Sequence, residues 1–359
     1  MKQTCTLAVT WLFCALLQVH GGPVSLEPGE ITALRALITT NAAAARQFAG
    51  IHRQADAALL DLPNPIEKIV SEGHLHNDPL KIRTGQSLPD LDKIAALAWT
   101  WAVTGDPRYV SQARTFILAW AAVNRPDGDA INETQLEPLI VGYDLLRATF
   151  ATADRQRVDD WLRAHATVLW QDRRGLTDNW FSHRLKIVGL IGWTIGDPAL
   201  ISEAVNGCHQ QINRNLHPDG ASNDFYKRDA LHYHLYDLEP LLTLARTAER
   251  AGQPLFAYTA PNGATLKSAV DFVVPFANGT KTHVEFVNSK VAFDLKRARN
   301  GEGEYAPHPW KPHTAIGLFS TAAWFLPEYG VLAAQLAGHP GEPCINWQTV
   351  VNTVSNHGP

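Results

Sequence analysis

The sequence predicts an all-α fold, an (α/α) toroid or incomplete barrel of antiparallel helical hairpins. Most segments between turn residues are rich in Ala, Leu and Arg, with apolar residues three and four positions apart, which is the spacing of one helix face. The connectors are short and carry Gly, Asp, Pro or Asn, as helix–helix corners do. Only residues 282–293 favour β structure.

The expected helices follow one another along the chain over residues 91–104, 109–123, 137–149, 154–169, 181–195, 201–216 and 237–251. Two corners share one pattern, Gly105-Asp106-Pro107 and Gly196-Asp197-Pro198. In each, Gly can end one helix, Asp can cap the next, and Pro suits the first turn. The repeat indicates helical hairpins.

The first 21 residues have the pattern of a secretory signal peptide. A basic start at Lys2 is followed by an apolar run over 7–17 and by small residues around Gly21. We therefore expect a secreted or periplasmic protein with a single domain over residues 22–359. No later apolar stretch reaches membrane length, so no membrane partner is expected. Cys208 and Cys344 remain in the mature chain, where one disulfide and two free thiols are both consistent with the sequence.

The composition argues against a nucleic-acid partner. A formal net charge of −4 gives no basic field of the kind that nucleic-acid-binding proteins have. An acidic substrate would have to be met by local cations, and one cluster could supply them: Lys290, Lys296, Arg297 and Arg299, with Asp294 among them. Trp180 and Trp310 are candidate platforms for sugar rings, although either could simply lie in the core.

Residues 226–241 carry proton-moving side chains on one face of an expected helix. If the helix runs from Asp229, one face is apolar, with Leu231, Leu235, Leu238 and Leu242. The opposite face carries Asp229, His232, Tyr233 and Tyr236, with Arg228 just before it. Carboxylate, imidazole and phenol groups are general acids and bases. The segment predicts one wall of an active site.

A second segment, 177–186, places Asn179 and His183 one helical turn apart on one face. Together with Arg184, these groups could bind a carboxylate and reduce its charge. The structural alternative is a capped helix with a core histidine.

Other polar residues support weaker hypotheses. On a helix, His232 and His234 point about 200° apart and cannot share an ion. His74, His76 and Asp78 could chelate a metal, cover a substrate cleft or remain solvated. We expect Asn132, Glu133 and Glu137 to serve a helix start, with substrate contact as the alternative.

The segments NWFSHRLK at 179–186 and RDALHYHLYDLEPLL at 228–242 resemble the alginate lyase superfamily of polysaccharide lyases. Supporting motifs lie at 105–121, 131–146 and 285–297, and the resemblance covers roughly residues 70–330. It implies an (α/α) toroid that cleaves a polyuronate by β-elimination without a required metal or other cofactor. The implied partner is an acidic polysaccharide.

Two residues depart from the pattern of the better-known members. Those carry His directly after the second Asn, where this chain has Trp180. They also place Arg seven residues before the catalytic Tyr, where this chain has Asp229 and the arginine is displaced to Arg228. The chain therefore resembles a divergent branch, similar to glucuronan and alginate lyases, with alginate (polymannuronate) or glucuronan as its β-1,4-linked substrate.

The chemistry assigns a role to each candidate. A uronate C5 proton becomes removable once its carboxylate is neutralised, which we expect of Asn179, His183 and Arg228. Tyr236 is the expected acid and base, and Tyr233 is the alternative. The pKa of the tyrosine that acts as the base would have to be lowered by neighbouring cations. The expected substrate-binding residues are Tyr233, His232, Asp229, Trp180, Arg184, Lys290 and Arg297.

Two other functions are compatible with these residues. An inverting glycoside hydrolase would need two separated carboxylates, for which Asp229 with Glu137 or Asp224 are candidates. A non-catalytic carbohydrate-binding protein could keep the same fold.

Overall fold

A computed structural model describes residues 22–355, so the expected signal peptide at 1–21 lies outside the described residues. The α-helices are α1 (Pro28–Thr40), α2 (Ala42–Ala58), α3 (Pro79–Ser87), α4 (Pro89–Thr104), α5 (Pro107–Val123), α6 (Ala130–Glu133), α7 (Glu137–Leu146), α8 (Thr152–Gln171), α9 (Asn179–Ile195), α10 (Pro198–Asn215), α11 (Asn223–Arg228), α12 (Leu231–Arg250), α13 (Leu266–Ala277), α14 (Ala292–Arg299), α15 (Ile316–Ala322), α16 (Pro327–Leu336) and α17 (Trp347–Val354). The short elements are η1 (Thr134–Leu136), η2 (Arg147–Thr149), η3 (Gly303–Tyr305), η4 (Pro312–Ala315), β1 (Val284–Glu285) and β2 (His308–Pro309).

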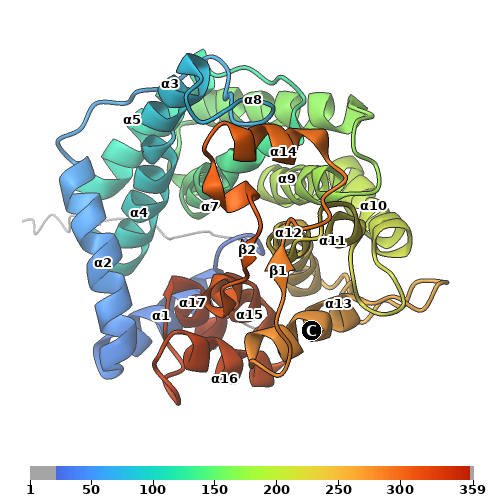
Figure 1. The fold of residues 1–359 in the computed structure, drawn as a ribbon. Coiled ribbons are helices and arrows are strands. Elements are labelled where there is room, and N and C mark those ends of the chain that lie inside the picture. Colours follow the sequence, from blue (N-terminus) through green and yellow to red (C-terminus); the bar gives the residue numbers. More distant parts are fainter. Residues whose placement is uncertain (1–21, 356–359) are drawn as a thin grey trace, which may run out of the picture.

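The helices form a closed ring. Successive neighbours around its inner layer are α4, α7, α9, α12, α15, α17 and α2, and α2 returns to α4 (Figure 1). Outer helices pack behind them, with α5 on α4, α8 and α10 on α9, and α13 on α12. The inner helices α4, α9 and α12 are thus covered on their outer side, and α14 and β2 cross the mouth of the ring (Figure 1). The predicted (α/α) toroid is confirmed.

The two repeated corners have the geometry that their residues predict. Gly105 and Gly196 both have φ of 72° and end α4 and α9 in the left-handed region, where Gly has no Cβ penalty. The Asp106 carboxylate accepts from the Arg108 N–H at 2.9 Å, and Asp197 accepts from Ala199 N–H at 3.1 Å. These corners turn the chain sharply between inner and outer layers.

One local prediction is confirmed only in part, and another is wrong. The β-leaning stretch 282–293 yields only the two residues of β1, which pair antiparallel with β2, and α14 begins within it. The helix expected from Asp229 begins two residues later, at Leu231. Asp229 has φ of 51° and ends α11, a left-handed position that Asp tolerates better than most residues.

The interior is continuous and apolar, and α9 is its most enclosed helix. All four leucines of the predicted stripe on α12 are buried there: Leu231, Leu235, Leu238 and Leu242. Cys208 and Cys344 are both buried free thiols, so the disulfide alternative is not realised. Among residues 22–355, the helices are too short or too polar to cross a membrane.

Candidate active site

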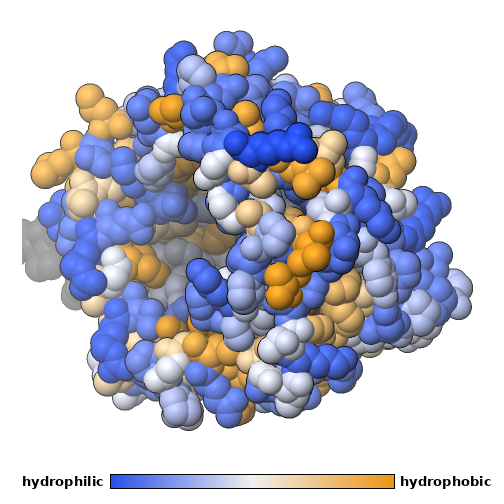
Figure 2. Space-filling view, in the orientation of Figure 1, coloured by the Kyte–Doolittle hydropathy of each residue, from blue (hydrophilic) through white to orange (hydrophobic). Residues whose placement is uncertain are grey.

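Three cavities adjoin one another at the mouth of the ring. Their volumes are about 430, 220 and 420 Å³. The 220 Å³ cavity is the central one. It shares Gln135 and Tyr236 with the 430 Å³ cavity, called the first, and it shares His232 and Tyr305 with the 420 Å³ cavity, called the third. The mouth is visible as a hollow in Figure 2. A row of connected cavities of this size suits an extended ligand better than a compact one.

Tyr236 and His183 meet at the junction of the first two cavities. Their ring centroids lie 4.3 Å apart. His183 of α9, one turn after Asn179, therefore contacts Tyr236 of α12. His183 Nδ1 is 2.8 Å from Thr134 Oγ1. Burial, with Lys186 adding to it, holds the pKa of His183 well below its usual value. The imidazole is therefore neutral at pH 7.

The pKa of Tyr236 is shifted in the direction opposite to our expectation. Burial is the main cause of the increase, followed by the charge of Glu72 and by Tyr305, and Arg297 opposes them only in part. The expected lowering of the pKa by cations is wrong, because burial and the Glu72 carboxylate outweigh Arg297. Tyr236 is therefore a protonated phenol in the resting protein.

Asn179 lies at the first position of α9 and is held by one carboxylate. Asp224 accepts from its backbone N–H at 2.7 Å and from its Nδ2 at 2.9 Å. Asp178 caps the helix by accepting from Trp180 N–H at 3.2 Å. The side-chain amide is thereby fixed at the wall of the central cavity, with one Nδ2 hydrogen left for a ligand.

Two arginines flank Tyr233 in the central cavity. The Arg228 guanidinium lies 3.7 Å from the centre of the Tyr233 ring, and Arg297 Nη1 donates to the Tyr233 hydroxyl at 3.1 Å. Lys81 also lines this cavity, where the single acidic residue is Glu72. The central cavity thus supplies the local cations that an acidic substrate requires of this acidic chain.

Arg297 is itself fixed by aromatic rings. Its guanidinium lies 4.2 Å from the centre of the Phe293 ring and 4.6 Å from that of Tyr305. Its nearest carboxylates, Glu72 and Glu302, are 3.9 Å away, beyond direct hydrogen bonding. The guanidinium keeps unused donor capacity toward the cavity.

Trp180 and His232 also line the central cavity. Arg174 lies over the Trp180 ring, with 4.8 Å between guanidinium and ring centre. His232 extends into the third cavity as well, and burial, followed by Arg228, lowers its pKa. His234 points to the other side of α12, where its Nε2 is 3.0 Å from the Ala269 carbonyl oxygen. The separation predicted for the two histidines is confirmed.

Three predicted substrate-binding residues lie away from all three cavities: Arg184, Asp229 and Lys290. Arg184 is enclosed on the opposite side of α9, where it donates to the Arg174 carbonyl oxygen at 2.9 Å. The Asp229 carboxylate accepts from the backbone N–H of Asn288 at 2.9 Å. Lys290 is exposed on the outer surface. Helix spacing alone did not reveal these orientations, and we remove the three residues from the candidate site. Trp310 is likewise a core residue.

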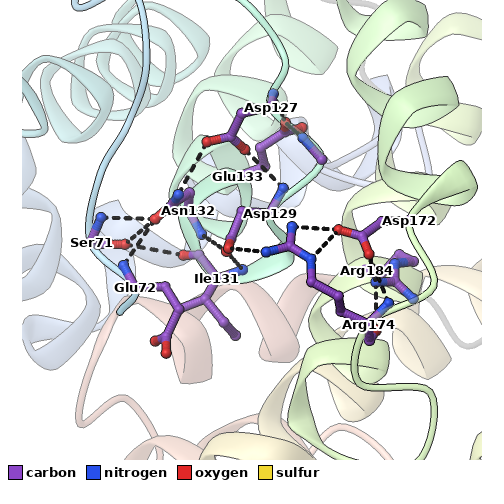
Figure 3. A network of polar contacts seen from close by, with 11 residues as sticks. Ser71, Glu72, Asp127, Asp129, Ile131, Asn132, Glu133, Asp172, Arg174 and Arg184 are labelled. Atoms are coloured by element: carbon purple, nitrogen blue, oxygen red, sulfur yellow. Dashed lines mark hydrogen bonds and ion pairs between the residues drawn. The ribbon is translucent and has the colours of Figure 1, made fainter. Parts of the chain in front are cut away.

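A polar network places Glu72 at the central cavity (Figure 3). The Asn132 side-chain oxygen accepts from Ser71 N–H at 2.8 Å and from Glu72 N–H at 3.0 Å. The predicted cap role of Asn132 is wrong, because Asp129 caps α6 by accepting from Ile131 N–H at 3.0 Å. Asn132 instead anchors the loop that carries Glu72.

Sequence reasoning missed the polar groups of the first cavity. Lys186 Nζ is 2.5 Å from Glu137 Oε2, so Glu137, which begins α7 as predicted, also lines the first cavity. Burial is the main reason why the pKa of Glu239 is raised to about 7. Lys186 and Glu239 each lie three residues after a predicted site residue, His183 and Tyr236. That i+3 spacing was the signal that could have found them.

His74 and His76 do not form a metal site together. His74 Nδ1 is 2.7 Å from Asp78 Oδ2, whereas His76 Nδ1 is 3.3 Å from Glu302 Oε1. Within residues 22–355 there is no group of three or more His, Cys, Asp or Glu residues arranged to hold an ion. The segment instead joins the loop of Glu72 to the turn after α14.

A comparison with known protein families agrees with the chemistry of this site. The model of the alginate lyase family matches residues 52–283, well over half of the chain. The chain belongs to the alginate lyase family. It is therefore a polysaccharide lyase, and the hydrolase and binding-only alternatives are set aside. Asp229 and Asp224, two of the carboxylates considered for hydrolysis, also lie outside the cavities.

Solved alginate lyases share the fold at low sequence identity. One from Bacteroides ovatus has a TM-score of 0.69 and 14% identity, over 92% of this chain and 98% of that one. Alginate lyase A1-III from Sphingomonas species A1 has a TM-score of 0.55 and 23% identity, over 74% and 81%. A Tyr-to-Phe variant of alginate lyase A1-III complexed with a tetrasaccharide gives 0.57 and 23%, with the same coverage. No curated protein sequence matches the chain.

The family match ends before the segment that completes the central cavity. Arg297 and Tyr305 come from residues 284–315, beyond the matched range. The matched range thus includes Tyr236, His183, Asn179 and Arg228, whereas Arg297 belongs to the resembling motif at 285–297.

Proposed function

We propose that this alginate lyase family protein cleaves a β-1,4-linked polyuronate, mannuronate-rich alginate or glucuronan, with Tyr236 as acid and base. The observation that carries the proposal is the position of Tyr236, which lines both the 430 Å³ and the 220 Å³ cavities. A polymer lying across both would place one glycosidic bond beside its hydroxyl.

The central cavity supports binding of the uronate whose proton is removed. Arg228, Arg297 and the Asn179 amide line it, and together they can hold a carboxylate and stabilise the charge that develops on it. Fixed donors of this kind are worth about 3–4 kcal/mol each in the transition state. His183 is neutral, so its part is to orient Tyr236 and not to supply charge.

The reaction follows from this placement. Tyr236, as phenolate, takes the C5 proton, and the electron pair left on C5 forms the C4–C5 double bond as the C4–O4 bond breaks. The same hydroxyl then protonates the departing O4. One residue can perform both transfers when the C5 hydrogen and O4 lie on one face of the sugar, as they do in mannuronate and glucuronate alike.

The two candidate substrates differ in configuration at C2 and not at the reacting carbons. The test is a panel of polymannuronate, polyguluronate, glucuronan and hyaluronan, followed by the ultraviolet absorbance of the unsaturated product. We expect product from polymannuronate or glucuronan and little from polyguluronate, whose C5 hydrogen lies on the opposite face. Polyguluronate as the preferred substrate, or chain shortening without absorbance, would refute the proposal.

We also propose that the protein acts outside the cytoplasm, in keeping with a polymeric substrate. This rests on the signal-peptide pattern of residues 1–21. Cell fractionation followed by immunodetection tests it, with the protein expected in the periplasmic or secreted fraction.

A further inference from the structure

Asp144 is a buried carboxylate that binds the first described residues of the chain. It lies on α7 and is 5% exposed. Its Oδ2 accepts from Gly22 N–H at 2.9 Å, from Ser25 N–H at 3.1 Å and from the Ser25 hydroxyl at 2.5 Å. All three donors are neutral and lie within four residues of one another.

The surroundings of Asp144 leave its charge uncompensated. Within residues 22–355, no Lys, Arg or His nitrogen comes within ion-pair distance of it. Arg250 on α12 is the nearest cation, but it donates to the Pro23 and Ser25 carbonyl oxygens and pairs with Glu30. Despite three hydrogen bonds, burial raises the pKa of Asp144. A buried carboxylate normally requires a cationic partner.

Gly22 is positioned to provide that partner. Its nitrogen already lies 2.9 Å from Oδ2. A Cβ at this residue would come within 3.2 Å of Asp144 Oδ1 and 3.6 Å of Oδ2, so the close approach suits Gly. The next residues hold it there, because Val24, Ser25 and Leu26 are buried.

We propose that cleavage between Gly21 and Gly22 completes this site: the α-ammonium group of Gly22 forms a buried ion pair with Asp144. Water hydrolyses the peptide bond, leaving a carboxylate on Gly21 and an amine on Gly22 that takes up a proton. The new cation replaces a neutral N–H at the same position. Export processing thereby stabilises an inner-ring helix, α7, which also carries Glu137 of the first cavity. This inference rests on the signal-peptide prediction and is independent of the proposed function.

The ion pair predicts a specific pH dependence. The charged groups around it are Arg250 from α12 and Glu27 and Glu30 near α1. On α7 itself, Arg147 pairs with Asp159 instead. A carboxylate partner raises the pKa of the amine above its unfolded value of about 7.7–8.0. The stabilisation is therefore complete below about pH 7.7 and is lost as pH rises through the folded-state pKa.

The test compares two chains that differ only at the N-terminus. One begins at Gly22, released from a cleavable fusion, and the other retains a single Ala before Gly22. At pH 7 we expect the Gly22 form to melt about 2–5 °C higher, and the gap to close toward pH 10. In Asp144→Asn the gap should be absent at every pH.

Two outcomes of the melting experiment overturn the proposal. Equal melting temperatures at pH 7 would show that the ammonium adds nothing, and a gap that persists at pH 10 would show that its charge is not the cause. Both can be read without Asp144→Asn, should that variant fail to fold. N-terminal sequencing of the exported protein provides the independent measurement, with Gly22 expected and any other first residue contradicting the proposal. Activity on polyuronates does not enter either measurement.

Discussion

Burial and the nearby Glu72 carboxylate keep Tyr236 protonated at neutral pH. A base must be deprotonated to act, and below its pKa the phenolate fraction rises about tenfold per pH unit. We expect kcat/KM to increase steadily from pH 7 to the alkaline limit of folding. Initial rates across pH, with circular dichroism at each point, provide the measurement. A plateau already reached at pH 7 would instead assign the base to His183, whose pKa is lowered.

Tyr233 offers a matched control for Tyr236, because both phenols line the central cavity from α12. Tyr236→Phe should lower kcat by about 10³-fold, since one group performs both proton transfers. Tyr233→Phe removes the hydroxyl that accepts from Arg297 and contacts Tyr305, and should mainly raise KM. Steady-state kinetics on the best substrate separates the two effects. Full activity of Tyr236→Phe would contradict the mechanism.

At this scale the sequence predicted contacts where helical spacing and motif position agreed. Asn179, His183 and Tyr236 do meet at the cavities. Arg184 follows His183 directly, and that one-residue step turns it about 100° around α9 and into the interior. The left-handed backbone at Asp229 could not be predicted, because it depends on hydrogen bonds from residues 286–288, far along the chain.

At the scale of elements, we expect the Asp residues of the Gly-Asp-Pro corners to stabilise the protein by capping helices. Asp197→Ala removes the cap of α10 and should destabilise the protein by about 1 kcal/mol. Asp160→Ala is the control, because Asp160 contacts the same Arg163 but caps no helix, so about 0–0.5 kcal/mol is expected. Urea unfolding measures both. Equal free-energy changes for the two variants would mean that the cap contributes nothing. The enzymatic activity of both variants should be unchanged, because α10 lines none of the three cavities.

The α14 helix provides a second pair of matched variants. Arg297→Gln removes a charged donor from the central cavity, whereas Arg299→Gln makes the same change at an exposed position of the same helix. We expect the first to raise KM for a polyuronate about tenfold or more, and the second to leave KM within about twofold. Similar KM values for both variants would exclude Arg297 from substrate binding.

The corners and the bounds of most expected helices were predictable because periodicity and capping are local, but the helix expected at 237–251 begins at Leu231. The path of residues 284–315 was not, because two-residue strands leave no periodic signal, and this segment is fixed by long-range contacts. One example is Phe286, whose N–H donates to the Asp229 carbonyl oxygen at 2.8 Å.

For the whole molecule, a net negative chain that binds a polyanion depends on a few local cations. Salt screens such attraction, with a Debye length of about 10 Å at 0.1 M. We expect KM for the polyuronate to rise with added NaCl while kcat at saturating substrate changes little. Michaelis–Menten series at several salt concentrations provide the check. A KM independent of salt would show that Arg228, Arg297 and Lys81 are not the groups that attract the substrate.

The ring of helices could be predicted from the sequence, because helical hairpins with short corners stack side by side. Its closure between α17 and α2 could not be predicted, because those helices lie at opposite ends of the described chain. The first cavity depends in part on this closure, because Gln348 of α17 belongs to its lining.

The division of the central cavity between residues 52–283 and residues 284–315 has a consequence for protein engineering. Tyr236, the residue proposed to transfer protons, lies in one stretch of sequence, and Arg297, which packs on the rings of Phe293 and Tyr305, lies in the other. Residues 284–315 can therefore be varied to change one wall of the cavity while Tyr236 stays in place.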